Sequence, residues 1–175
     1  MSVKVTTLAS GLRIASDYMG TVETVSVGAW VAVGTRHEEQ KLNGISHLIE
    51  HLAFKGTKKR SAFSIAAEIE AVGGQMNAYT SRENTAFYAK VLKGDVALAV
   101  DIISDILQNS TIEPNELERE RQVVIQEIHQ SHDIPDDIIF DHFQETAYPN
   151  QAIGRPILGK AKLIKDIKRK TLMEY

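Results

Sequence analysis

Residues 44–54 have the sequence Gly44-Ile45-Ser46-His47-Leu48-Ile49-Glu50-His51-Leu52-Ala53-Phe54. The apolar residues among them, with Gly56 soon after, predict a mostly buried helix. His47 and His51 are four residues apart, so they project from one helix face, where both imidazoles can reach one metal ion. Glu50 lies on the same arc, within reach of a water molecule at that ion. The stretch therefore predicts two metal ligands and a general base on one helix.

A third ligand has to come from elsewhere, because hydrolytic zinc sites use three protein ligands and leave a fourth position open. The expected long helix 115–130 carries four glutamates, Glu116, Glu118, Glu120 and Glu127. Glu120 and Glu127 are seven residues apart, which places them about two turns apart on one face. Glu127 lies in an apolar run, where an unpaired carboxylate would be costly to bury. A cation would remove that cost, so Glu127 is the expected third ligand.

Short strands and helices alternate along the chain. Strands are expected over residues 3–7, 12–16, 24–33, 75–80 and 85–92. Further helices are expected over residues 61–72, 96–108, 115–130 and 136–146, and another from residue 164. This order predicts an α+β fold with a mainly antiparallel sheet and helices packed on one face. The length suits one domain, 1–175, which we expect to be incomplete at its C-terminal end.

Charge and composition limit the partners. The formal net charge of −3 offers no large positive field, so a nucleic-acid partner is not expected. No apolar run approaches the roughly 20 residues that span a bilayer, so no membrane partner is expected either. The chain has no cysteine, and a bound metal must therefore be held by histidine, carboxylate or backbone oxygen.

Other charged groups give weaker patterns. His129, His132 and His142 lie near or beyond the end of the long helix, and their spacing matches no metal-ligand pattern. The basic run that contains Lys55 and residues 58–60 is expected to be a solvated loop, with contact to an acidic partner as the less favoured alternative.

The expected location is a bacterial cytoplasm. The N-terminal segment 1–6 shows no targeting pattern, and the absence of cysteine fits a reducing compartment. The alternative is the mitochondrial matrix, which would require that a transit peptide had already been removed from the chain.

The run 44–57 resembles the active-site helix of the inverzincin, or pitrilysin-type M16, metallopeptidases, in which the HxxEH motif is inverted relative to HExxH. Within the family it is similar to the processing peptidases and their bacterial relatives. The resemblance implies that His47, His51 and Glu127 bind zinc and that Glu50 is the general base. Glu120 matches a glutamate that supports the site from outside the ligand set, although a salt bridge or a solvated position is an equal alternative.

The same resemblance implies how the substrate is held. Segment 73–80 is similar to the family's edge strand, which pairs with an extended peptide, and Asn77 and Ala78 are the expected substrate contacts. The implied function is a zinc-dependent endopeptidase that cleaves extended or presequence-like peptides with metal-activated water.

The alternatives concern partners and activity. The resemblance implies an enzyme built from two homologous halves, so a second homologous domain or partner subunit is expected. The fragment alone is expected to be inactive. A non-catalytic partner subunit or peptide-binding module is the alternative function. A purely structural zinc site is disfavoured, because such sites normally have four protein ligands. An exposed sheet edge would allow a homo-oligomer of the fragment.

Overall fold

A computed structural model of the chain describes residues 3–175, so the first two residues of the predicted domain lie outside the described part. The strands are β1 Lys4–Thr7, β2 Arg13–Ser16, β3 Thr24–Val31, β4 Gln75–Thr80 and β5 Thr85–Leu92. The helices are α1 Ile45–Ala53, α2 Ala62–Ala71, α3 Val96–Asn109, α4 Pro114–Asp133, α5 Pro135–Ala147, α6 Ala161–Asp166 and α7 Arg169–Glu174. No helix among the described residues is long and apolar enough to cross a membrane.

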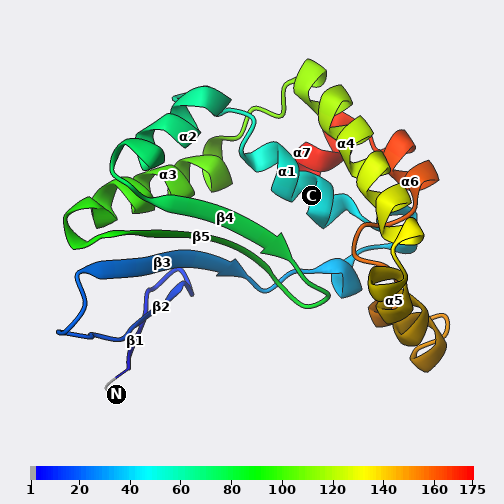
Figure 1. Cartoon of the computed structure of the whole chain (residues 1–175), viewed down its shortest axis with the longest axis horizontal. Coiled ribbons are helices and arrows are strands. Elements are labelled where there is room, and N and C mark those ends of the chain that lie inside the picture. Colours follow the sequence, from blue (N-terminus) through cyan, green and yellow to red (C-terminus); the bar gives the residue numbers. More distant parts are fainter. Residues whose placement is uncertain (1–2) are drawn as a thin grey trace.

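The central sheet has the order β3-β5-β4, and both of its pairings are antiparallel. Helices α2 and α3 cover the face that points away from the β1–β2 hairpin (Figure 1). The apolar layer between helices and sheet contains Ile65 of α2, Ile102 and Ile106 of α3, and Phe87 and Ala89 of β5. The predicted α+β class, with helices packed on one face of an antiparallel sheet, is confirmed.

The first hairpin stands apart from this layer. Strands β1 and β2 pair only with each other, and all of their residues are exposed. The two strands were predicted correctly, and because they pair with no other described strand they contribute no buried residue to the core.

A second apolar cluster joins α1 to the helices at the other end of the molecule. It includes Ile45 and Leu48 of α1, Val124 and Ile128 of α4, and Ile164 of α6. Helix α1 also contacts β4, so it lies between the sheet and α4 (Figure 1). Its burial on both sides agrees with the mostly buried helix that its sequence predicts.

The helix expected from residue 164 is instead two short helices, α6 and α7, separated at Ile167 and Lys168. Both separating residues have extended backbone conformations. The guanidinium of Arg121 donates to the carbonyl oxygens of Ile164, Lys165 and Ile167. These bonds satisfy backbone acceptors that the end of α6 leaves without helical partners, which explains the break.

The predicted solvated basic loop is wrong for Arg60. Its side chain is only 6% exposed and pairs with Glu68, Asp101 and Asp105. Asp105 is itself buried, and it also accepts a hydrogen bond from Thr57. The network ties the segment after α1 to α2 and α3, because each carboxylate comes from one of those helices.

Replacing Arg60 by methionine should lower the free energy of unfolding by about 3 kcal/mol, because Asp105 would keep its buried charge without its cationic partner. Urea denaturation of Arg60→Met against the wild type measures the change. Arg119→Met is the matched control, since Arg119 is 73% exposed and its pair with Glu116 is expected to contribute little. Equal losses in the two variants would contradict a specific role for Arg60.

Candidate metal centre

The start of α1 is fixed by Glu38, a residue that sequence reasoning missed. Its carboxylate is buried and accepts from the backbone N–H groups of Gly44 and Ser46 at 2.8 and 2.9 Å, and from the Asn43 amide at 3.0 Å. Gly44 has a φ of 97°, a conformation that favours glycine, and it offers no side chain to cap the helix. The available signal was a glutamate six residues before Gly44, the glycine that precedes the helix.

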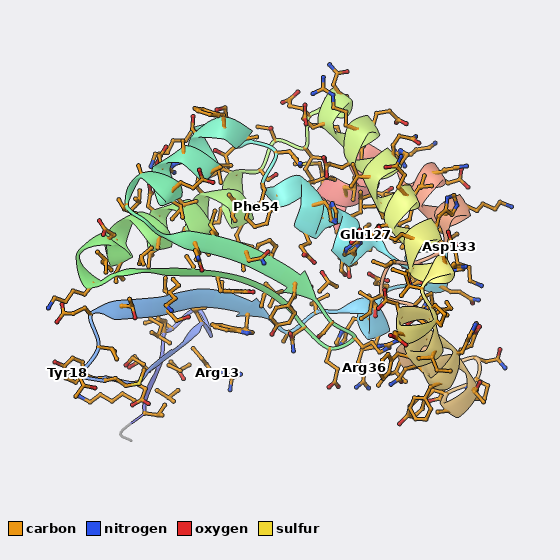
Figure 2. The ribbon with its side chains drawn as sticks, in the orientation of Figure 1. Arg13, Tyr18, Arg36, Phe54, Glu127 and Asp133 are labelled. Atoms are coloured by element: carbon orange, nitrogen blue, oxygen red, sulfur yellow. The ribbon has the colours of Figure 1, made fainter. Side chains whose placement is uncertain are left out.

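Helix α4 packs against α1, and Glu127 lies on the side of α4 that faces α1 (Figure 2). One ligand atom from each of His47, His51 and Glu127 lies within 4.8 Å of the others. The Glu127 Oε2 atom is 3.7 Å from the Nε2 atom of His47 and 3.4 Å from that of His51. The structure thus brings together the three residues that the sequence picks as ligands.

The polar atoms of this cluster are poorly satisfied by the protein itself. Glu127 Oε2 and His47 Nδ1 are both buried and have no hydrogen-bond partner. Buried polar atoms normally find partners, and a cation beside Oε2 would supply one there. Two imidazoles with one carboxylate form a donor set suited to zinc, with room for a further ligand.

One premise of the sequence prediction is wrong. Glu127 was expected to lie in apolar surroundings, yet its side chain is 44% exposed. Helix α4 turns Val124 and Ile128 into the core and leaves Val123 exposed, so the apolar run does not enclose the carboxylate. Only the oxygen that faces the histidines is buried.

The pKa shifts of two of the three clustered residues, His47 and Glu127, favour metal binding. Burial, together with the neighbouring His51, lowers the pKa of His47 from 6.5 to about 4. The close contact with His51 lowers the pKa of Glu127. His51 behaves oppositely, because the neighbouring carboxylates of Glu127 and Glu120 raise its pKa despite burial. Metals bind the neutral form of histidine and the ionised form of glutamate, so the shifts of His47 and Glu127 favour binding and the shift of His51 opposes it.

Glu50 lies beside the cluster without belonging to it. Its Oε2 atom accepts a hydrogen bond of 2.6 Å from the Thr80 hydroxyl at the end of β4. Burial raises the pKa of Glu50, and the bond with Thr80 opposes that effect. A carboxylate whose pKa moves toward neutral pH is better suited to accept and return a proton.

Glu120 is buried rather than solvated, which removes one of the alternatives open at the sequence level. One carboxylate oxygen is 3.1 Å from His51 Nδ1 and the other is 2.8 Å from Lys55 Nζ. Glu120 therefore forms a salt bridge and also contacts a proposed ligand from behind. A carboxylate in this position fixes the orientation of a metal-binding imidazole.

The edge of the sheet is open next to this cluster. Strand β4 pairs with β5 on one side and with no other strand among residues 3–175. The Ser81 N–H bonds to Asn84 O at the turn, and bonded pairs alternate along a hairpin, so the Ala78 N–H faces the free side. There it donates to the Asn77 side-chain oxygen at 2.8 Å. The two expected substrate contacts thus lie on an unpaired edge strand.

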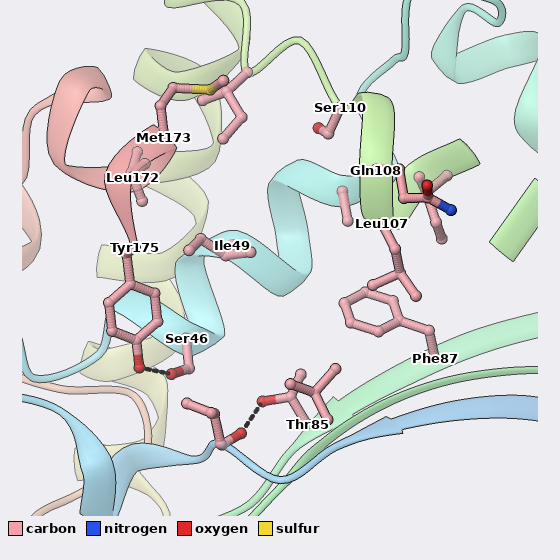
Figure 3. A pocket seen from close by; sticks show the side chains of 15 residues that line it. Ser46, Ile49, Thr85, Phe87, Leu107, Gln108, Ser110, Leu172, Met173 and Tyr175 are labelled. Carbon is pink, nitrogen blue, oxygen red and sulfur yellow. Dashed lines mark hydrogen bonds between the residues drawn. The ribbon is translucent and has the colours of Figure 1, made fainter. Parts of the chain in front are cut away.

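An apolar cavity of about 410 Å³ lies on another side of α1 (Figure 3). Ser46, Ile49 and Ala53 line it from α1, Phe87 lines it from β5, and Tyr175 closes one side through a bond with Ser46. None of the three proposed ligands lines this cavity, so it is separate from the metal cluster. His129, His132 and His142 do not join the cluster either.

Comparisons with known proteins identify the family and the fold. Residues 13–161 match the family described as Insulinase (Peptidase family M16). The chain is 48% identical over 172 residues to the mitochondrial-processing peptidase subunit beta of Homo sapiens, covering 98% of this chain and 35% of the relative. For the subunit of the same name from Neurospora crassa the identity is 46% over 175 residues, covering 100% of this chain and 37% of the relative.

Two solved structures share the fold. A protease from Helicobacter pylori has a TM-score of 0.93 at 25% identity, covering 99% of this chain and 42% of that one. A peptidase M16 inactive domain from Pseudomonas fluorescens has a TM-score of 0.91 at 14% identity, with the same coverage, and shows the fold alone.

The sheet with α1 and α4 beside it is therefore the fold of a peptidase-type α+β domain. The chain belongs to the insulinase family, peptidase family M16. It spans about a third of the length of the curated relatives. Those relatives are mitochondrial by name, and the bacterial cytoplasm expected from the sequence stays a prediction.

The lowered pKa of His47 predicts a pH dependence of stability in the metal-free protein. As the pH falls from 6.5 to about 4, the unfolded chain takes up a proton at His47 that the folded chain does not. The free energy of unfolding should therefore fall by on the order of 3 kcal/mol more in the wild type than in His47→Asn. Urea denaturation across this pH range, with a chelator present, measures the difference. A pH-independent difference between the two proteins would contradict the shift.

Proposed function

We propose that this chain is the zinc-binding part of a peptidase that hydrolyses extended or presequence-like peptides, with His47, His51 and Glu127 as ligands and Glu50 as the general base. The proposal depends mainly on one observation: three ligand atoms from α1 and α4 converge beside the partly buried carboxylate of Glu50, at an open strand edge. Membership of a peptidase family supports it.

Each side chain has a defined task in this proposal. When bound, zinc would act as a Lewis acid and lower the pKa of a water molecule. Glu50 would take the proton from that water and return it to the leaving amine. Its carboxylate would be oriented by Thr80, whose hydroxyl already bonds to one of the oxygens. Glu120 would keep the His51 ring in place from behind.

The open edge of β4 would select the substrate. A peptide that adds to this edge as a strand must be extended and must not already be paired with another strand. Binding would require the Asn77 side chain to release the Ala78 N–H, because that donor would serve the incoming backbone. Folded proteins would therefore be poor substrates.

Further parts are needed for activity. The chain spans about a third of its relatives, which carry the word subunit in their names. We propose that a second homologous domain or a partner subunit completes the enzyme and that the isolated chain is inactive. The alternative is a non-catalytic member of the family, and the Pseudomonas fluorescens domain, described as inactive, shows that such domains share this fold.

Zinc binding by the chain itself is the first test. Elemental analysis after dialysis should find about one zinc per wild-type chain. The variants His51→Ala and Glu127→Gln should lose it, because each removes one of three ligands. His142→Ala is the matched control, since His142 is exposed on α5 and outside the cluster, and it should retain the metal.

Three outcomes would contradict the proposed metal site or change its interpretation. Zinc retained in both ligand variants would exclude the proposed ligand set. Zinc absent from this chain but present in a longer protein would show that the remaining parts are needed to form the site. Zinc absent from both would favour the non-catalytic alternative.

The role of Glu50 is tested by replacing it with glutamine. Glu50→Gln should bind zinc as the wild type does, because Glu50 is not one of the clustered ligands. In the full-length protein the same substitution should abolish peptide cleavage, because glutamine cannot accept the proton. Cleavage of a fluorogenic peptide measures the loss, and retained turnover would remove Glu50 from the role of base.

A further inference from the structure

We propose that Lys55 is a positioning residue of the metal centre, which holds Glu120 in the orientation that fixes the His51 ring. The inference extends the proposed function, because it assigns a role in that site to a residue that is neither a ligand nor the base. It rests on a chain of contacts from Lys55 through Glu120 to His51.

Glu120 uses its two oxygens on two different donors. Oε1 lies 2.8 Å from Lys55 Nζ, and Oε2 lies 3.1 Å from His51 Nδ1. The side chain of Glu120 is 8% exposed, so water offers little alternative to either donor. A buried carboxylate that lost one of two such donors would reorient to recover a partner. Lys55 therefore determines which way Oε2 points.

The position of Lys55 suits this task. It follows the end of α1, four residues after His51, and its backbone N–H donates to Leu52 O at 3.1 Å. Its side chain is two-thirds buried, at 33% exposure, with the ammonium beside α4. The segment directly after the helix of the two histidines thus supplies the cation that orients the carboxylate behind His51.

The His51 ring lies between two carboxylates that compete for its proton. In the neutral ring only one nitrogen carries hydrogen. Nδ1 is 3.1 Å from Glu120, whereas Nε2 is 3.4 Å from Glu127 Oε2, which has no hydrogen-bond partner. The shorter contact favours a proton on Nδ1, which leaves the Nε2 lone pair facing His47 and Glu127. Lys55 selects this tautomer by holding Glu120 in place.

If Lys55 acted only through its charge, removing it would strengthen metal binding, whereas a positioning role predicts weaker binding. Loss of a nearby cation would strengthen the pull of Glu120 on the Nδ1 proton and would raise the affinity of the site for a metal cation. Positioning predicts a mixed tautomer and weaker metal binding. The two accounts therefore predict changes of opposite sign in the zinc affinity of a variant without Lys55.

The first measurement uses metal-free protein at a pH where His51 is neutral. Imidazole ¹⁵N NMR should show the Nδ1–H tautomer in the wild type and a mixture of tautomers in Lys55→Met and in Glu120→Gln. Lys55→Arg should largely restore the wild-type pattern, because it keeps the charge and a donor. Lys59→Met is the control, since Lys59 is 58% exposed and pairs with Asp101 away from the cluster. An unchanged tautomer in Lys55→Met would overturn the proposal.

The second measurement is zinc affinity, by competition with a chromogenic chelator. Lys55→Met should bind zinc about 10-fold more weakly, at the lower end of the effect of residues that support metal ligands. In a Glu120→Gln background the same substitution should have no further effect. Tighter binding in Lys55→Met, or an equal loss in both backgrounds, would overturn the proposal. If neither this chain nor a longer protein bound zinc, the proposed function would fail, and the tautomer measurement would still decide the role of Lys55.

Discussion

The packing of α1 against α4 is the contact on which the candidate site depends. Leu48 of α1 and Val124 of α4 are both fully buried in this contact, and it carries Glu127 to the two histidines. Neither helix contains a complete set of ligands. Since close-packed apolar side chains leave little freedom, the distance between histidines and glutamate is determined by residues that have no part in the chemistry.

Charge is distributed unevenly over this contact. Helix α4 supplies two carboxylates, Glu120 and Glu127, on opposite sides of the His51 ring, whereas His47 meets only Glu127. The two carboxylates raise the pKa of His51, whereas burial and the neighbouring His51 lower that of His47. The pair is therefore not symmetrical, and only one of its members has protein support behind the ring.

Much of the fold could be predicted from the sequence, because periodicity and turn residues are local signals. The strands β4 and β5 and the helix α4 lie close to their expected ranges. The histidine spacing and the glutamate of α4 were also readable, since helical geometry fixes which residues share a face. The interruption between α6 and α7 was not, because it depends on Arg121, which lies more than forty residues earlier in the chain. The burial of Arg60 was missed for the same reason, because Asp101 and Asp105 lie more than forty residues later in the chain. Glu38 was missed although its partners are local, because it lies before the helix and outside the usual capping position.

The contact between Asn77 and the amide of Ala78 also bears on solubility. A free strand edge invites pairing with any other extended chain, including the edge of a second copy, and can begin aggregation. By occupying one outward-facing donor with its own side chain, the protein reduces the number of free backbone groups on β4. The protection is local and reversible, because it consists of a single neutral hydrogen bond. The edge can thus be guarded in the resting protein and still remain available to a strand that offers several bonds at once.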